Sequence, residues 1–524
     1  MTDTFEVVRT ASVTSFTSRE HGPQTAAARL RDLGFHCGAG RDVTRRLLDT
    51  FDGRLNAAGL RLELCELDGD ARELILSGTG TATARFVVVG APRFVRDLPH
   101  GPFSARLAAL VDVRALLPVM SVEATATPFV LRDRTGKLVV TTTLYEDLCV
   151  VDHDDIDLAP WMIEVHALVG YAKRAKRVCE ALEQLGLQGE ATDVLTMAAT
   201  SAAIDLSGFA GVPGVPLDPG MTAIDGFRAV LTNLADTISA NWHGAADQID
   251  PEFLHDLRVA VRRTRTVLRQ GRWVLPESVV GPAVDRFGSL GTLTGPLRDL
   301  DVYLLEWDSY TAMFEPVVLA ALEPVREVLE RRHEIASATL TSALQSPEAT
   351  TWFAEWQHWL TEPMPDANRG VHADRQLGHE VARHIQRAQH KLVTDGRLVE
   401  PDTPAEEVHN LRKDAKKLRY LFECFASLLP EPERKSFVQR LKALQDNLGE
   451  HQDAEVHVGE LRAISYELHD DGASSATMRA IGQLTERLDE RRVAARVAFA
   501  ERFEAYDTPA TRRALAAALE GIAR

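Results

Sequence analysis

HDLRVAVRRTR, residues 255–265, carries four arginines and one acid in eleven residues. HNLRKDAKKLR, residues 409–419, repeats this layout at an offset of 154 residues. At the same offset LGTLTGPLRDLDV, residues 290–302, falls on LQDNLGEHQDAEV, residues 444–456, so the register holds without a gap from residue 255 to residue 302. A repeat of this length predicts two homologous helical units that pack against each other about a pseudo-twofold axis.

Helical periodicity continues on both sides of the repeat. From residue 221 to residue 524 the strand signals stop, and long helical segments are separated by short polar or proline-containing breaks such as LPES, LPEPER and DDGASS. Residues 433–448 and 451–469 are predicted as two of these helices. The region is too long for one four-helix bundle, and we divide it into halves of about 221–365 and 370–524.

The chain before this region has a different pattern. Residues 1–206 contain short β-rich runs such as GLRLELCEL and KLVVTTTLYEDLCVV, with Gly/Asp turns that are typical of hairpins. Helices are expected at about 23–33, 171–185 and 191–204. The Gly/Pro-rich segment SGFAGVPGVPLDPG, residues 207–220, predicts a linker. The predicted fold class is therefore α+β and multidomain, with an antiparallel β domain followed by an all-α domain.

The composition limits the classes of protein that fit. At 524 residues the chain is too long for one core, and 45% hydrophobic with 26% charged residues is typical of a globular protein. No apolar run reaches about 18 residues and no signal-like N-terminus is present, so we expect no membrane association and a cytoplasmic location. The five cysteines form no CxxC pair, which argues against a disulfide framework or a zinc site. A net charge of −17 argues against general nucleic-acid binding.

Positive charge in each copy of the repeat is concentrated on one helical stripe. Helix positions 0, 3, 7, 10 and 14 lie on one face. In the first copy these positions hold His and Arg from His255 to Arg269, and in the second copy the stripe runs from His409 to Arg419 and ends at Glu423. Helices usually interleave acids with such cations, because like charges at i,i+4 cost roughly 0.2–0.5 kcal/mol. The pattern favours an anionic ligand over a solvated face, and arginine favours phosphate because its guanidinium makes bidentate contacts.

The candidate ligand-binding residues comprise the two stripes, their flanking cations and a weaker strip between the two copies. They are His255, Arg258, Arg262, Arg263, Arg265, Arg269, Arg383, Arg387, His409, Arg412, Lys413, Lys416, Lys417 and Arg419. The charged residues expected to hold the arginines through ion pairs, or to cap a helix, are Arg298, Asp299, Asp301, Asp453 and Glu455. Metal ligation by these acids is the alternative, and no cofactor is expected.

The doubled pattern HxLRxxxRRxR with LGxLRDLDV closely resembles the CHAD domain, a helical domain named for its histidines, over residues 221–524. The second copy departs from the family pattern at Gln452, where the first copy has Arg298. The resemblance implies two four-helix bundles that face each other across a basic groove. It also implies binding of inorganic polyphosphate and association with polyphosphate granules.

Residues 1–206 look like a CYTH domain, the triphosphate tunnel fold. LLDTFDGRLNAAGLRLEL, residues 47–64, is similar to the family segment DTxDxxLxxxGxxLRxR. That family implies an eight-stranded antiparallel tunnel that hydrolyses or cyclises triphosphates, with carboxylates for a divalent metal and a Lys/Arg lining. Its ExExK signature falls here on EVVRT, so Val8 and Thr10 replace a glutamate and the lysine. We predict a degenerate tunnel without triphosphatase activity, in which Glu6 and Glu164 are residual metal candidates.

Three other functions stay open at this point. A metal-dependent triphosphatase would use the tunnel-like domain, and Val8 and Thr10 count against it. A nucleic-acid binder would need aromatic residues for base stacking beside the stripes, where Tyr420 and Trp273 lie close in sequence. The third alternative is a scaffold that recognises a partner protein.

Overall fold

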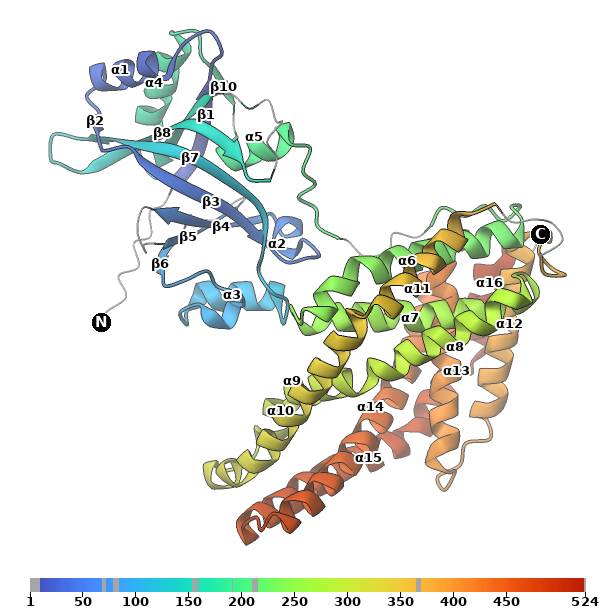
Figure 1. Cartoon of the computed structure of the whole chain (residues 1–524). Coiled ribbons are helices and arrows are strands. Elements are labelled where there is room, and N and C mark those ends of the chain that lie inside the picture. Colours follow the sequence, from blue (N-terminus) through green and yellow to red (C-terminus); the bar gives the residue numbers. More distant parts are fainter. Residues whose placement is uncertain are drawn as a thin grey trace. The chain divides into compact units, whose positions relative to one another are not determined.

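The computed structural model describes residues 10–67, 72–78, 84–152, 158, 160–190, 192–209, 215–363 and 369–522. The chain divides into two compact units, Met1–Gly211 and Val212–Arg524 (Figure 1). None of the described helices combines the length and the hydropathy that a membrane crossing requires.

The N-terminal unit is built on one antiparallel sheet. Its strands are β1 (Thr10–Thr17), β2 (His36–Cys37), β3 (Arg41–Asp49), β4 (Leu60–Leu67), β5 (Arg72–Gly78), β6 (Ala84–Val88), β7 (Leu117–Arg132), β8 (Leu138–Val150), β9 (Trp161–Leu168) and β10 (Gln188–Glu190). They follow the order β10-β1-β9-β8-β7-β3-β4-β5-β6, and β2 pairs with β7. All of these pairings are antiparallel, as predicted for this unit.

Helices cover parts of this sheet. They are α1 (Pro23–Asp32), α2 (Arg54–Ala57), α3 (Pro102–Val111), α4 (Ala172–Glu183) and α5 (Val194–Ser201). α1 and α4 contact each other (Figure 1). They pack over a core that contains Phe16, Phe129 and Trp161. α5 begins where the Asp193 side chain accepts a hydrogen bond from the Thr196 amide (2.8 Å), which satisfies a free donor of the first turn. The three helices predicted near residues 23, 171 and 191 are confirmed.

The described part of the C-terminal unit is helical, as predicted for this region. Its helices are α6 (Ala223–Ala246), α7 (Pro251–Gln270), α8 (Glu277–Leu293), α9 (Gly295–Thr311), α10 (Pro316–Leu344), α11 (Pro347–Thr361), α12 (Leu377–Gly396), α13 (Ala405–Cys424), α14 (Glu431–Asp470), α15 (Ser475–Tyr506) and α16 (Pro509–Glu520). The starts of α6 and α12, of α7 and α13, and of α8 and α14 each differ by 154 residues (377 − 223, 405 − 251 and 431 − 277). The helix boundaries therefore follow the sequence repeat.

One predicted break is wrong. α14 continues without interruption from residue 431 to residue 470, whereas α8 ends before Thr294 and α9 begins after it. The first copy has Pro296 at the start of α9, where the missing N–H removes a helical hydrogen bond and favours a helix end, and the second copy has Glu450 there (296 + 154 = 450). Gly449 costs the continuous helix about 1 kcal/mol. Burial of Leu448 and Ala454 beside it favours continuity.

The starts of α6 and α12 meet in a symmetric contact. Thr222 and Gln376 form an antiparallel β-bridge, and their numbers differ by 154. The Ala223 amide donates to the Arg375 carbonyl (2.7 Å), and the Leu377 amide donates to the Met221 carbonyl (2.9 Å). These two bonds exchange when every residue is moved by 154 positions, which is the property of an isologous contact about a twofold axis.

The far ends of the two halves share one core. Tyr303 and Leu329 belong to the first half, Leu461 and Leu484 belong to the second, and all four lie in a single cluster of buried side chains. Helix α10 accordingly contacts both α14 and α15. The two halves are therefore joined at the starts of α6 and α12 and again through this shared core.

Candidate anion-binding site

The two basic stripes lie on α7 and α13, and these helices contact each other. Each helix buries an apolar face. On α7 this face includes Leu257 and Val261, and on α13 it includes Leu411 and Ala415. Because the apolar residues fill the core, the cations that directly follow them in the sequence, such as Arg258 after Leu257 and Lys416 after Ala415, are left on a neighbouring face.

Arg258 and Arg412 occupy equivalent positions (258 + 154 = 412), and a following helix holds each of them. Arg258 Nη1 donates to Thr294 Oγ1 (2.9 Å) and to the Gly291 carbonyl (3.2 Å), both at the end of α8. Arg412 Nη2 donates to Asp453 Oδ1 (2.9 Å) on α14. These contacts fix the directions of two guanidinium groups of the stripes.

Lys416 lies among these arginines. Burial lowers the pKa of Lys416 to about 7, and the positive charges of Arg412 and Arg262 add to this effect. Burial and the neighbouring charge of Arg262 lower the pKa of Arg258 to about 10. Like charges held this closely destabilise one another, and a bound anion would relieve the repulsion.

A hollow of about 490 Å³ opens between α7 and α13. Its lining consists of Arg262, Arg265, Thr266, Arg269, Gln270, Lys413, Asp414, Lys416, Lys417 and Tyr420. Six of these residues are Lys or Arg and one is an acid. That acid, Asp414, already pairs with Lys391 of α12 (2.7 Å). The hollow therefore presents a strongly positive wall.

Five cations around this hollow have no partner among the residues that the structure describes. Within the described part of the chain, neither a hydrogen bond nor an ion pair is made by the side chains of Arg262, Arg265, Arg269, Lys416 and Lys417. The Nε atoms of Arg262 and Arg265 are also buried without an acceptor. An unsatisfied buried donor costs roughly 1–3 kcal/mol, and more if it is charged. The arrangement is therefore unfavourable unless an acceptor enters from outside.

Other predicted binding residues are paired inside the protein. Arg263 Nη2 and Arg419 Nε both donate to the Glu423 carboxylate, each at 2.6 Å. Lys413 Nζ donates to Asn410 Oδ1 (3.2 Å) and still lines the hollow. Of the two stripes, the one on α7 therefore contributes more unpaired cations than the one on α13.

The two predicted histidines lie near the starts of the stripes, and both are half-buried. His409 Nδ1 donates to Gln452 Oε1 at 2.6 Å. Gln452, which departs from the family pattern, thus orients His409. Burial lowers the pKa of His409 below its ordinary value, with Lys413 and Arg412 adding to the effect, so this imidazole is neutral at neutral pH.

The strip predicted on α12 divides into a bound and an exposed part. Arg383 donates to Glu380 and contacts His372 Nδ1 (3.2 Å), so it is engaged within the unit. Arg387 is exposed. Burial lowers the pKa of His384 to about 4, and the charges of Arg383 and Arg387 contribute to this shift. Arg387 therefore adds to the positive potential at the surface of α12.

The acids predicted to support the arginines are arranged less uniformly. Asp453 forms the ion pair with Arg412, and burial raises the pKa of Asp299 with Asp453 acting in the same direction. The remaining three charges pair elsewhere: Asp301 with His333 (2.8 Å), Glu455 with Arg492 (3.4 Å) and Arg298 with Glu252 (3.8 Å). Among the described residues, no group of three or more His, Cys, Asp or Glu side chains could hold a metal ion.

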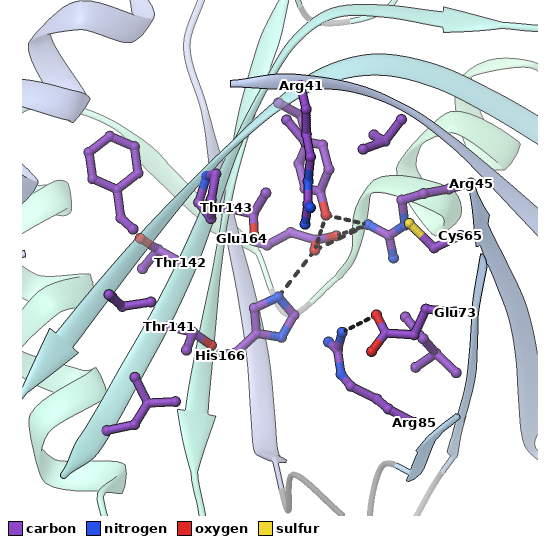
Figure 2. A pocket seen from close by; sticks show the side chains of 18 residues that line it. Arg41, Arg45, Cys65, Glu73, Arg85, Thr141, Thr142, Thr143, Glu164 and His166 are labelled. Carbon is purple, nitrogen blue, oxygen red and sulfur yellow. Dashed lines mark hydrogen bonds and ion pairs between the residues drawn. The ribbon is translucent and has the colours of Figure 1, made fainter. Parts of the chain in front are cut away.

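Strands β3 to β9 of the N-terminal unit line a cavity of about 340 Å³ (Figure 2). Arg45 lies in its wall, where it contacts Glu63 (2.6 Å) and Glu164 (3.2 Å) and donates to the Tyr145 hydroxyl (2.9 Å). Glu164 Oε1 also accepts a hydrogen bond from the Val194 amide (2.8 Å). Burial by itself would raise the pKa of Glu164. The positive charge of Arg45 outweighs this effect and holds the pKa of Glu164 far below its usual range. The carboxylate proposed as a residual metal ligand is therefore occupied by a guanidinium.

Other charged side chains of the N-terminal unit are also paired, and the second predicted carboxylate, Glu6, is not among the described residues. Arg85 pairs with Glu73 across the cavity wall (2.9 Å; Figure 2), and Arg61 pairs with Asp193. The sequence reasoning missed Arg45. A signal was present, because Arg45 lies two residues from Val43 and two from Leu47, which places all three on the same buried face of β3.

Comparison with known proteins agrees with the architecture of the helical unit. Residues 229–462 match the model of the CHAD domain family, and the C-terminal unit therefore contains a CHAD domain. No curated protein matches the chain.

Several solved structures are similar to parts of the chain. The CHAD domain from the plant Ricinus communis is 24% identical, with a TM-score of 0.45, over 56% of this chain and 95% of that one. PptA from Streptomyces chartreusis is 18% identical, with a TM-score of 0.43, over 54% of this chain and 99% of that one. The putative adenylyl cyclase HpAC1 from Hippeastrum, with a dominant triphosphatase activity, is 14% identical, with a TM-score of 0.26, over 36% of this chain and 94% of that one.

Proposed function

We propose that this protein binds inorganic polyphosphate in the hollow between α7 and α13. The observation that carries the proposal is the group of five cations without a partner in the described structure: Arg262, Arg265, Arg269, Lys416 and Lys417. A polyanion would supply acceptors for several of them at once, and a hydrogen bond to a charged group contributes about 1.5–3 kcal/mol. The CHAD domain match supports the same ligand, because resemblance to this family implies polyphosphate binding.

The length of the basic stripe favours a polymer over a single phosphate. Arg258 and Arg269 are eleven residues apart on α7, which corresponds to about 16 Å along the helix axis. One phosphate cannot contact both ends, whereas a chain of phosphates presents a charge at each unit. Binding is by ion pairing, and no bond is broken. Association with polyphosphate granules is part of the proposal, since the polymer there presents the same groups.

The test is binding of long-chain polyphosphate at two salt concentrations with a chelator present. We expect tight, metal-independent binding that weakens as salt rises, because the counterions of the polymer are released on binding. Replacing Arg258, Arg262 and Arg265 together by glutamate should weaken binding by at least about a hundredfold, since each 1.4 kcal/mol corresponds to a factor of ten. Equal affinity of this variant and the wild type would refute the site.

A matched control separates the site from the overall charge. It carries the same three Arg→Glu changes on exposed helical positions that do not line the hollow: Arg326, Arg479 and Arg502. We expect this control to bind within about threefold of the wild type, because exposed charges beyond about 8 Å are largely screened. A comparable loss in the control would point to non-specific attraction.

Nucleic-acid binding is the main alternative for the same surface. Single-stranded nucleic acid usually stacks its bases on aromatic side chains. Tyr420 is the aromatic residue that lines the hollow, while Trp273 is outside this lining. Competition between polyphosphate and RNA distinguishes the two ligands, and displacement of bound polyphosphate by RNA at equal charge concentration would contradict the proposal.

For the N-terminal unit we propose that triphosphatase activity is absent. The support is the pairing of Glu164 with Arg45, since a divalent metal needs carboxylates that are free to coordinate it. The similarity to HpAC1 makes triphosphate hydrolysis the second candidate. Release of phosphate from tripolyphosphate with Mg²⁺ or Mn²⁺ tests it, and a release that disappears in Glu164→Gln would refute our interpretation.

A further inference from the structure

The pair of helices α7 and α13 has two symmetry-related sides, one at Arg263 and Glu423 and the other at Arg269 and Lys417. These two sides differ in charge although the helices are equivalent. Arg269 corresponds to Glu423 (269 + 154 = 423), and Arg263 corresponds to Lys417 (263 + 154 = 417). The ion pair between Arg263 and Glu423 therefore has its symmetry counterpart in Lys417 and Arg269. One side joins opposite charges, and the other side brings two cations to the same place.

Glu423 engages both arginines on its side. Its carboxylate accepts from Arg263 of α7 and from Arg419 of α13, both at 2.6 Å. Burial lowers the pKa of Arg263, but the charge of Glu423 outweighs it and holds this pKa above its ordinary value. The two arginines that the stripes would offer on this side are thus already bound to an anion.

Among the described residues, no carboxylate bridges Arg269 and Lys417 on the opposite side, since Asp414 pairs with Lys391. Arg269 and Lys417 both line the hollow, and neither has a hydrogen-bond or ion-pair partner among the described residues. Burial lowers the pKa of Lys417; Asp414 acts against this shift, while the positive charges of Lys391 and Arg269 act with it. The cations on this side therefore repel each other unless a ligand lies between them.

We propose that Glu423 confines polyphosphate to the Arg269–Lys417 side, so that the ligand site is one-sided although the domain is pseudo-symmetric. This inference rests on the proposed function and adds a specificity-determining residue to it. Glu423 occupies with its own carboxylate the position that a phosphate would take on the symmetric side. Its role is to exclude the polymer from that position, and it does not touch the ligand.

Replacing Glu423 by the residue of its counterpart tests this inference. Glu423→Arg releases Arg263 and Arg419 and adds a third cation, so a long polymer can extend onto the symmetric side. Each phosphate neutralised on a single-stranded polyanion contributes about 0.7 to the slope of log K against log[salt], so we expect a slope steeper by roughly 2. Affinity for long-chain polyphosphate should rise about tenfold or more. Affinity for tripolyphosphate should stay within about twofold, because a short ligand fills the hollow alone.

Two further variants control for charge and folding. Glu423→Gln keeps an acceptor for one arginine and removes the negative charge. It should therefore give an intermediate slope of log K against log[salt], even if Glu423→Arg is unstable. Glu330→Arg adds the same two units of positive charge on α10, where Glu330 pairs with Arg326 at i,i+4 as Glu423 pairs with Arg419. This control should behave as the wild type does, and thermal unfolding confirms that all three variants fold.

The outcomes separate the inference from the function on which it rests. Suppose that the wild type binds polyphosphate, that the variant with Arg258, Arg262 and Arg265 replaced by glutamate does not, and that both Glu423 variants keep the wild-type salt slope. The one-sided site is then refuted, and polyphosphate binding stands. An equal gain in Glu330→Arg also refutes the inference, because the effect is then one of net charge. If the wild type does not bind polyphosphate at all, both proposals fall.

Discussion

The affinity for polyphosphate should fall as the pH rises above neutrality, and Lys416 supplies the physical reason. The pKa of this side chain is lowered from 10.5 to about 7, because burial removes it from water and Arg412 and Arg262 repel its charge. Asp453 opposes the shift without cancelling it. A polyanion beside Lys416 would favour the charged form and return the pKa towards its ordinary value. Binding above pH 7 therefore requires the uptake of a proton.

The magnitude follows from this linkage. Above pH 7 each further pH unit weakens binding by up to tenfold, or about 1.4 kcal/mol, until the pKa of the bound state is reached. Between pH 6.5 and pH 8.5 the loss amounts to about 20-fold. The stability of the free helical unit should change in the opposite direction. Between about pH 7 and pH 10.5 the unfolded chain binds a proton at Lys416 that the folded chain does not, so folding becomes more favourable as the pH rises.

The assay is a titration with long-chain polyphosphate at pH 6.5, 7.5 and 8.5 and constant ionic strength. Lys416→Arg is the matched variant, because it keeps the positive charge at every pH and places at 416 the residue type of its counterpart Arg262. We expect this variant to bind tightly with little pH dependence. The reasoning is refuted if the wild-type affinity changes by less than about threefold over this range, or if Lys416→Arg retains the wild-type slope.

Two further predictions concern stability. Arg45→Met should lower the protection of β3 and β9 from amide hydrogen exchange by about 3–5 kcal/mol, because it leaves buried Glu164 uncompensated; unchanged protection would contradict this account of the cavity. Gly226→Ala should destabilise the contact of α6 with α12 by about 1–3 kcal/mol, since the added Cβ would lie 2.3 Å from Leu377 Cδ2. Gly281→Ala, which meets no atom within 4 Å, is its control and should cost nothing in the same exchange experiment.

Features that depend on local spacing could be predicted. The basic stripes occupy one face of α7 and of α13 because His and Arg recur at the period of a helix, and Leu257 and Leu411 accordingly lie in the core. The pair of Arg419 and Glu423 was within reach as well, because residues four apart on a helix are neighbours. The continuity of α14 could not be predicted in this way, since the packing that stabilises the helix across Gly449 is not local.

Periodicity and register along the chain suffice to predict a β-rich unit and a helical unit, a repeat at an offset of 154 in the helical unit, and a cationic stripe in each copy. Which cations stay unpaired depends instead on the three-dimensional packing. Arg263 meets Glu423 of another helix and Arg45 meets Glu164 of another strand, whereas Arg269 meets Lys417. Charges compensate according to their separation in space, and the packing of helices and strands sets that separation for residues more than a hundred positions apart.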